Sequence, residues 1–563
     1  MTRKPGPNVF MVMRDNNDGQ RGNGFHRRFR TAAVAVVWST ALAFALGTGM
    51  PVVAAEVTND RREGVPTDAA MLPNGGNPPA EPTSERQGSV DADPVGGSLI
   101  DPEAAETGGE PLSKERAADG VPKGPMAQFQ LPLHTRIGRP QRTATQFLKY
   151  QYSWGSESEI TYRRNPDLNN RVRDDSLILT PQVNGTVVYR PTDWLVTTLE
   201  MILEWEIAAQ EEKRITLPNG ETQFAKKRRA SLAVDQAFVT IQGITAPFEF
   251  HAGRRNYEDE RHWLYDTSMD VASIMFKKGH VRAEAFAGRE VLWDLDLLKK
   301  QERDRIDTYM LYADYRGIED IKVAGYTVFR NDRAKEEGRP LLFGVSAQGM
   351  PSDSFSFWTQ LAFLRGSDEL KRNISGHAFD VGGTYRFLGF PFHPSVTLGY
   401  AFATGDGNPN DDKNSEFRQT GLQSNEAKFA GISQFKVYGE ALDPELSNLE
   451  ILTAGLGFRP AQNFTVDLVY HRYRLDEIAD EIRNSALTAQ MNQDDTMLGK
   501  DMGSAIDIVL GFRNLFGVRR LGLDLRAGWF FPGKAFRIEE GDPDNPVFRP
   551  ADKGNSIVAK FWW

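Results

Sequence analysis

The sequence predicts an all-β fold, a transmembrane antiparallel up-and-down β-barrel of about 18 strands, and three observations carry this prediction. From about residue 145 onward, apolar and polar residues alternate in segments of roughly ten residues, as strands between lipid and water require. Eighteen such segments can be recognised, and tight turns alternate strictly with long polar loops between them. A soluble β-sandwich has no physical reason to sort its connections by length in this way.

The first part of the chain precedes this pattern, and residues 1–55 are predicted to be a signal peptide. An apolar stretch, 31–47, follows the basic run 27–30, and the small residues Val53 to Ala55 suit cleavage after Ala55. A short signal anchor is the alternative. The chain has no cysteine, so an exported form has no disulfide scaffold.

Residues 56–141 are predicted to be a disordered acidic linker. They are rich in Pro, Gly, Asp, Glu, Ser and Thr, and they have few aromatic residues and no sustained periodicity. Such a segment buries too little apolar surface to offset its conformational entropy. It is either a tether for a periplasmic partner or a plain spacer. The barrel is predicted to occupy 142–563.

Each predicted strand is an alternating segment bounded by turn residues. Val183 and Val187 share one face of their segment, for example, while Gln182, Asn184 and Thr186 share the other. The predicted strand cores are 147–154, 176–189, 194–206, 231–243, 248–255, 270–277, 281–292, 307–316, 321–330, 340–348, 355–365, 377–387, 395–404, 449–458, 463–474, 505–513, 521–531 and 556–563. The clearest tight turns are 190–193, 277–280, 317–320, 350–353 and 459–462, and the longest loops are 207–230, 405–448, 475–504 and 532–555.

Charged residues on the predicted strands are assigned to the lumen, because a charge that faces lipid near the midplane costs several kcal/mol. The basic set is Lys149, Arg255, Arg282, Arg386, Arg459, Arg513, Arg526 and Lys560, and the acidic set includes Glu200, Glu204, Asp380, Asp507 and Asp524. These groups either form ion pairs that stiffen the wall, for example Asp524 with Arg513 or Arg526, or offer a basic track to carboxylates. A barrel of this size leaves an aqueous lumen.

Other site types find little support. The net charge of −9 gives no reason to expect a nucleic acid partner. The loop 406–412 lacks the glycine that an EF-hand needs, and His251, His262 and His280 lack metal-ligand spacing, so no metal or other cofactor is expected. Nothing marks His471, Asp467 and Ser504 as a catalytic set, so we do not expect an enzyme.

Three segments carry a resemblance to a known family. The most specific is Phe-Arg-Gln-Thr-Gly-Leu-Gln-Ser-Asn at 417–425, followed by Lys428 and Phe429. Supporting segments are Ala-Thr-Gly-Asp-Gly-Asn at 403–408 and Gly-Arg-Arg-Asn-Tyr-Glu-Asp-Glu-Arg at 253–261. These segments resemble the alginate-export family of bacterial outer-membrane barrels, and the resemblance covers about 145–563.

The resemblance implies an 18-stranded barrel in the outer membrane of a Gram-negative bacterium, with a basic constriction that binds uronate carboxylates. By motif it assigns Arg418, Lys428, Arg254 or Arg255, Arg472 with Arg474, and Lys149 to substrate binding. Lys428 stands where the family leads us to expect arginine. Alternation adds Arg386, Arg459, Arg513 and Arg526 to these candidates.

Arg472 and Arg474 pose a conflict within these predictions, because they fall on the same alternation as Phe464, Val466 and Leu468, which is assigned to lipid. Either a bulge turns the two arginines inward or they lie beyond the hydrocarbon.

The predicted function is a passive, charge-selective channel for an anionic exopolysaccharide, an alginate-like polyuronate. Its expected partners are that polysaccharide, outer-membrane lipid and periplasmic polymer-secretion proteins. The main alternative is a diffusion porin for small anions or oligosaccharides, and a weaker one is an outer-membrane enzyme or adhesin.

Overall fold

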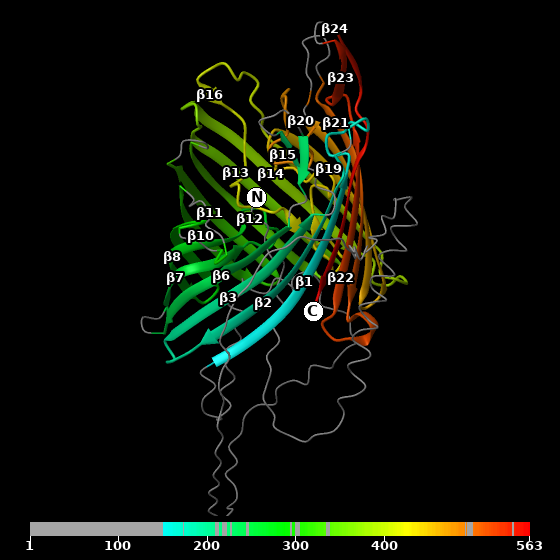
Figure 1. Ribbon diagram of the computed structural model, residues 1–563. Helices are drawn as coiled ribbons and strands as arrows, with labels where there is room; N and C mark the ends of the chain where they lie inside the picture. Colours follow the sequence, from blue (N-terminus) through cyan, green and yellow to red (C-terminus); the bar gives the residue numbers. More distant parts are fainter. Residues whose placement is uncertain are drawn as a thin grey trace, which may run out of the picture. The chain divides into compact units, whose positions relative to one another are not determined.

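Eighteen long strands in the described part of the chain pair side by side in one antiparallel sheet, and the last of them pairs with the first (Figure 1). The computed structural model describes residues 150–563 except 173, 209–212, 217–221, 226–227, 244–246, 293–295, 299–304, 334–337, 490, 492–498 and 543–544. The predicted signal peptide, the predicted linker and Lys149 lie outside these residues. The prediction of an all-β barrel of about 18 strands is confirmed.

The barrel strands follow one another in chain order. They are β1 (Tyr150–Arg164), β2 (Ser176–Tyr189), β3 (Leu195–Ala208), β6 (Arg228–Gln242), β7 (Phe248–Glu258), β8 (Asp266–Lys278), β9 (Val281–Arg289), β10 (Ile306–Ile318), β11 (Ile321–Asp332), β12 (Arg339–Ser352), β13 (Phe355–Ser367), β14 (Asn373–Arg386), β15 (Ser395–Ala403), β19 (Leu449–Ala461), β20 (Phe464–Leu475), β21 (Asp501–Arg513), β22 (Gly522–Pro532) and β25 (Gly554–Trp562).

The remaining elements lie in the connections. They are β4 (Lys213–Thr216) with β5 (Thr222–Ala225), β16 (Lys413–Asn414), β17 (Glu426–Ala427) with β18 (Phe435–Lys436), the 3-10 turn η1 (Leu515–Gly517), and β23 (Arg537–Asp542) with β24 (Asn545–Pro550). Short β16 pairs parallel to the start of β14. No helix in the described residues is long and apolar enough to cross a membrane.

The two faces of each strand differ as the alternation predicts. On β2, Val183 and Val187 are 44% and 43% exposed, whereas Gln182 and Thr186 are buried. On β15, Leu398 is 62% exposed and its neighbour Thr397 is buried. An outer surface of exposed Val, Leu, Phe and Tyr is unfavourable in water and suits contact with lipid.

The connections are sorted by length between the two ends of the barrel, but less strictly than predicted. Connection 368–372 belongs to the end that carries the long loops, yet it is shorter than connection 387–394 at the other end. The short one is closed by Asp368, whose carboxylate accepts hydrogen bonds from the backbone N and the Nε of Arg372 at 2.8 and 2.7 Å. We call the two ends the long-loop end and the short-turn end.

The first strand continues ten residues beyond its predicted core, to Arg164. The alternation of apolar and polar residues is lost there, because none of Ser156, Glu157, Ser158 and Glu159 is apolar. The structure explains the extension, because Nζ of Lys560 on β25 lies 2.7 Å from Oε1 of Glu157 across the closing seam.

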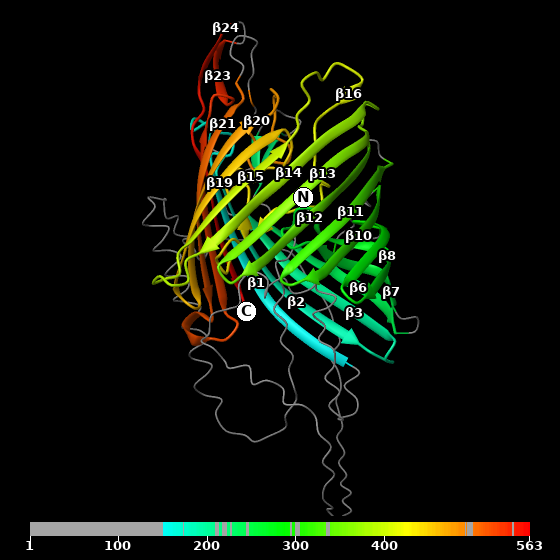
Figure 2. The ribbon, with the colours of Figure 1, turned by 180° about the vertical axis from the view of Figure 1, so that it is seen from behind.

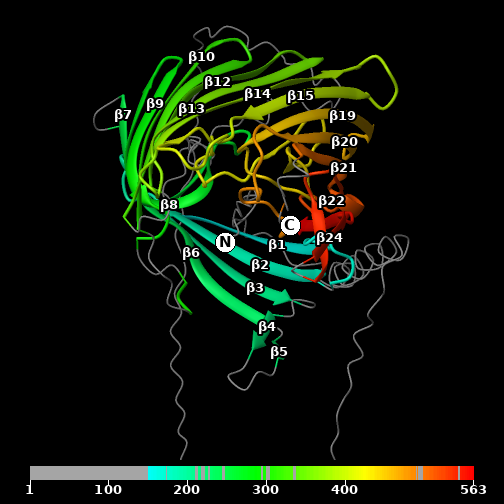
Figure 3. The ribbon, with the colours of Figure 1, turned by 90° about the horizontal axis from the view of Figure 1, so that it is seen from above.

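The longest connection, between β15 and β19, folds back into the barrel. Figure 3, seen from above, shows this yellow segment inside the ring of strands, and Figure 2 shows the whole barrel from behind. We call residues 416–448 the inner loop. Its apolar side chains, among them Phe417, Phe435 and Leu446, are fully buried, so the inner loop forms the core between itself and the wall.

Candidate functional site

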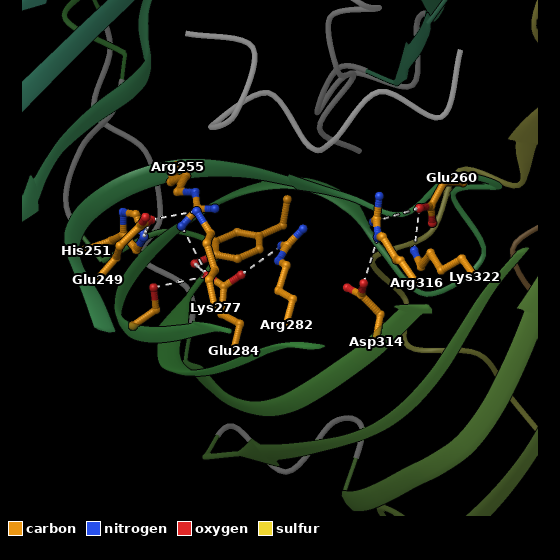
Figure 4. A network of polar contacts seen from close by, with 12 residues as sticks. Glu249, His251, Arg255, Glu260, Lys277, Arg282, Glu284, Asp314, Arg316 and Lys322 are labelled. Carbon is orange, nitrogen blue, oxygen red and sulfur yellow. Dashed lines mark hydrogen bonds and ion pairs between the residues drawn. The ribbon is translucent and has the colours of Figure 1, made fainter. Parts of the chain in front are cut away.

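The inner wall of β7 to β9 carries a charged cluster around Glu284. Nη1 of Arg255 lies 3.1 Å from Oε1 of Glu284, and Nη2 of Arg282 lies 3.3 Å from Oε2. Figure 4 shows both guanidinium groups directed at this carboxylate. The hydroxyls of Ser273 and Tyr257 also donate to Oε1, at 3.2 and 3.4 Å. Glu284 is thus held by two cations and two hydroxyls.

Arg255 keeps part of its guanidinium group without a protein partner. Its side chain is 1% exposed, yet Nε and Nη2 have no hydrogen-bond partner among the described residues. A buried N–H without an acceptor costs free energy. Nε and one terminal nitrogen form an edge of the guanidinium that can bind a carboxylate with two parallel hydrogen bonds.

The charges continue along β10 and β11 (Figure 4). Nε of Arg316 donates to Oδ1 of Asp314 at 2.8 Å, and Nη2 of Arg316 lies 3.8 Å from Glu260. Nζ of Lys322 also contacts Glu260, which comes from the β7–β8 connection. On the other side, Lys277 pairs with Glu249 at 2.7 Å. Acidic and basic groups therefore alternate along this half of the wall.

The β7–β8 connection, residues 259–265, turns into the lumen and meets the inner loop. The carboxylate of Asp259 accepts hydrogen bonds from the backbone N of Trp263, Leu264 and Tyr265 at 3.1, 2.8 and 3.1 Å, which fixes the turn. Nε1 of Trp263 donates to the hydroxyl of Tyr438 at 3.0 Å. Two long-loop-end connections thus join across the interior.

His262 lies at this junction. Its backbone carbonyl accepts hydrogen bonds from the backbone N of Ser424 and Asn425, and its Nδ1 lies 3.0 Å from Oγ of Ser424 and 3.3 Å from Oδ2 of Asp266. Burial alone would lower the pKa of His262, but Asp266 and Glu258 outweigh it and raise the pKa to about 9. The imidazole is therefore cationic at neutral pH in this structure.

The inner loop is fastened to the far wall by ion pairs around Arg526 on β22. Nη1 of Arg526 lies 3.4 Å from Glu426 and 3.6 Å from Glu440, both on the inner loop. Lys436 lies 3.6 Å from Glu426 and 3.2 Å from Asp443. Arg526 and Glu440 are buried, so salt screens this pair weakly, whereas Glu426, Lys436 and Asp443 remain partly exposed.

The two glutamates that share Arg526 have opposite pKa shifts, although burial acts on both in the same direction. Burial would raise the pKa of Glu426, but Lys436 and Arg526 outweigh it and hold the pKa at about 2. For Glu440, burial dominates over Arg526, and the nearby Asp507 adds to it, so the pKa is raised to about 7. Glu440 is thus the loop carboxylate that takes up a proton near neutral pH.

Further contacts hold the inner loop along its length. Asp524 on β22 accepts hydrogen bonds from Arg513 at 2.7 Å and from the hydroxyl of Ser433. Arg513 also donates to the carbonyl of Ile432 at 2.7 Å. On β13, the ring of Trp358 stacks on Phe429 at a centroid distance of 5.7 Å. Asp524 thus pairs with Arg513, one of the two ion pairs that the sequence offered as the alternative to a basic track.

The structure separates the neighbouring arginines 254 and 255. Gly253 has a φ of +120°, and a Cβ there would collide with the carbonyl oxygen of Ala237, so β7 approaches β6 closely just before them. Arg255 shares the inward alternation of His251. Arg254 shares that of the exposed Phe250, and its Nη1 donates to the carbonyl of Glu290 at 2.6 Å and lies 3.6 Å from Asp270.

Arg472 and Arg474 lie on the outward face of β20, between the buried His471, Tyr473 and Leu475. Arg472 pairs with Asp501 at 2.8 Å, and Arg474 lies 3.8 Å from Glu450. The register does shift between Tyr473 and Arg474, but the shift does not turn the side chains inward. Strand alternation predicted this orientation, and the motif resemblance did not.

The other predicted residues lie in three regions. Arg418 and Lys428 are half-buried on the inner loop. Arg386 and Arg459 lie on the inward alternation at the short-turn end, where Arg386 donates to the carbonyl of Asp353 at 3.3 Å. The predicted inward acids Glu200, Asp380, Asp507 and Asp524 are all buried, whereas Glu204 is partly exposed.

Sequence reasoning missed Glu426, Lys436 and Glu440, because they belong to a loop without strand alternation. It also missed Glu284 and Lys322, although their inward alternation could have identified them. For the three loop residues, the sequence offered one signal, which is that they follow closely after the 417–425 motif.

A family model described as Alginate export matches residues 143–548. Three relatives bear the name Alginate production protein AlgE. The one from Pseudomonas aeruginosa is 25% identical over 333 residues, 52% of this chain and 66% of the relative. The one from Pseudomonas syringae pv. tomato is 23% identical over 393 residues, 61% and 76%. The one from Azotobacter vinelandii is 28% identical over 166 residues, 27% and 34%.

The chain therefore spans about a third of the Azotobacter relative and just under two thirds of the P. aeruginosa relative. Among solved structures, P. aeruginosa OccK11 (OpdR) has a TM-score of 0.44 at 11% identity, over 73% of this chain and 95% of that chain. Acinetobacter baumannii OccAB3 has a TM-score of 0.46 at 9% identity, over 74% and 100%.

Proposed function

Because the chain belongs to the alginate export family, we propose that its lumen conducts an anionic exopolysaccharide of the alginate-like polyuronate class out of the cell. The protein is a barrel of the Gram-negative outer membrane, and family and fold point to a transport channel rather than an enzyme. The names of the relatives support the choice of a polyuronate. Passage is passive and selects for negative charge.

The observation that carries the proposal is Arg255. It is buried on the inner wall, it already binds one carboxylate through Nη1, and its Nε and Nη2 have no partner among the described residues. These two nitrogens are covered in this structure, so a uronate carboxylate would bind this edge with two hydrogen bonds once the covering side chains move aside. A neutral sugar would leave the same edge poorly satisfied.

Other charges on the inner wall would let the polymer move on. Arg282, Arg513 and Arg526 each hold a carboxylate of the protein itself. A polymer carboxylate that replaces such a partner exchanges one charge-assisted bond for another, so the net free-energy change per step is small. We include Arg418 and Lys428 of the inner loop, and Arg386 and Arg459 at the short-turn end, as further exchange positions.

Single-channel conductance in planar bilayers tests the proposal. We expect anion selectivity and block by polyuronate oligomers. Arg418→Ala weakens the block because it removes a loop cation. Arg255→Lys keeps the charge but loses the two-bond edge, so the inhibition constant rises by about tenfold, the equivalent of about 1.4 kcal/mol.

Arg339→Ala is the matched control, because this arginine is exposed on the outward alternation of β12. Arg474→Ala distinguishes the motif resemblance, which assigns Arg474 to substrate binding, from the strand alternation, which places it outside the lumen. Because Arg474 lies on the outward face, we expect the block by polyuronates to be unchanged. Cation selectivity without any block by polyuronates would contradict the export proposal and favour a porin for small solutes.

A further inference from the structure

Three side chains that can bind a metal ion gather where the β7–β8 connection enters the lumen. Glu258 ends β7, His262 lies in the connection, and Asp266 begins β8. One ligand atom from each lies within 4.8 Å of the other two. They are four residues apart in the sequence, a spacing that indicates no metal motif. The turn between β7 and β8 brings them together, with Glu258 opposite Asp266.

The backbone of the connection is rigid enough to hold these three groups together. Asp259 fixes it with hydrogen bonds from the backbone N of Trp263 and Leu264. Asp266 is fixed from the other side, since its backbone N donates to the carbonyl of Leu422 at 2.7 Å. A preformed site loses less conformational entropy on binding than a flexible one.

The donor set is one imidazole and two carboxylates. His262 and Asp266 are buried, and Glu258 is partly exposed, so an ion could enter from the Glu258 side. Imidazole nitrogen favours zinc-like transition metals over calcium and magnesium, which prefer oxygen alone. Three protein ligands leave at least one coordination position open. Ser424 of the inner loop lies beside the same imidazole nitrogen, 3.0 Å away.

The local charge also favours a cation. The carboxylates of Glu258 and Asp266 both lie beside the imidazole of His262. Arg261, the nearest arginine in sequence, is directed elsewhere, toward Asp380 at 3.4 Å and over the ring of Trp358 at 4.2 Å. A divalent ion bound by the imidazole would balance the charge of these two carboxylates.

We propose that Glu258, His262 and Asp266 form a binding site for a zinc-class divalent transition metal at the junction of the β7–β8 connection and the inner loop. This site is independent of the transported polymer, and it requires no transport to be detected. Bound metal would tighten a connection that directly contacts the inner loop, so it would stabilise the junction between the two.

The test uses the untagged full chain, folded in detergent, with Co²⁺ as a coloured probe and Zn²⁺ as its competitor. The chain has no cysteine and eight histidines, so rival sites are few. We expect one equivalent of Co²⁺ to give visible absorption bands that Zn²⁺ removes. Zn²⁺ raises the Tm, because it binds the folded state. In His262→Gln the Co²⁺ affinity falls at least roughly tenfold and the Tm rise disappears.

His251→Gln is the matched control, since this buried histidine lies on β7 outside the cluster, and it should keep both responses. Asp266→Asn is the second variant if His262→Gln does not fold. The proposal is overturned if the native chain gives no Co²⁺ bands, or if His262→Gln and Asp266→Asn bind Co²⁺ as the native chain does. Equal stabilisation by Ca²⁺ that survives His262→Gln would also overturn it, because it would show binding by carboxylates without the imidazole.

Discussion

At the scale of single residues, the charge of each carboxylate inside this barrel depends on the cations beside it. Arg526 holds two, and they behave oppositely: Glu426 stays ionised because Lys436 supports it, whereas Glu440 is pushed toward its protonated form by burial and Asp507. The guanidinium of Arg526 thus lies between Glu426, which stays charged, and Glu440, which titrates near neutral pH.

Glu440 therefore makes stability depend on pH. Its folded-state pKa of about 7 lies above its ordinary value of 4.5, so the folded form binds the proton more tightly. The corresponding stabilisation is complete below about pH 4.5 and is lost as the pH rises through 7, up to roughly 3 kcal/mol. We expect Glu440→Gln, which mimics the neutral acid, to remove this slope in urea unfolding followed by tryptophan fluorescence.

Glu481→Gln, an exposed glutamate, is the control and should keep the native pH slope. Parallel pH profiles for the native chain and Glu440→Gln would show that Glu440 does not titrate in this range.

At the scale of elements, strands and loops differed in how far they could be predicted. Alternation found the barrel strands because lipid on one side imposes a period of two on each strand by itself. It also oriented Arg472 and Arg474 correctly, against the motif resemblance. The inner loop gave no such pattern, because Phe417 and Phe429 are buried against wall residues far away in sequence.

The inner loop gives the prediction at this scale. Replacing 419–445 by a short Gly/Ser linker should leave the barrel folded, because strand pairing does not involve these residues, and should raise the single-channel conductance about twofold or more. The buried wall charges, such as Asp507, would then become hydrated.

Removal of the β23–β24 hairpin, 537–550, is the matched control and should leave the conductance unchanged. This hairpin also belongs to a long loop, but it makes none of the inner-loop contacts described above. An unchanged conductance in the 419–445 variant would mean that the inner loop does not limit flow.

At the scale of the whole molecule, closure depends on two strands at opposite ends of the sequence. β1 and β25 pair antiparallel, with Ile160 opposite Ala559, and the backbone groups of Ser156 and Trp563 exchange hydrogen bonds at 3.0 and 2.9 Å. The sequence predicted an even number of strands, but the register of this seam depends on pairs such as Glu157 with Lys560, which no single segment reveals.

An engineered cross-link tests that register. Directly opposed residues of antiparallel strands have Cα atoms roughly 4.5–5.5 Å apart, within reach of a disulfide. Because the chain lacks native cysteine, oxidation of Ile160→Cys with Ala559→Cys should link the seam and raise the Tm of the barrel. The offset pair Ile160→Cys with Ser556→Cys should not link, and efficient linking of that pair instead would mean a different register.

The fastening of the inner loop to Arg526 and Asp524 has a consequence for how the barrel is assembled. The loop precedes β19, β20, β21 and β22 in the chain, yet its anchors are on β22, the strand that leads to the closing strand β25. The contacts of the inner loop with Arg526 and Asp524 can form only after β22 has joined the sheet. We therefore expect the docking of the inner loop on β22 and the closure of the ring to be late, coupled steps of folding.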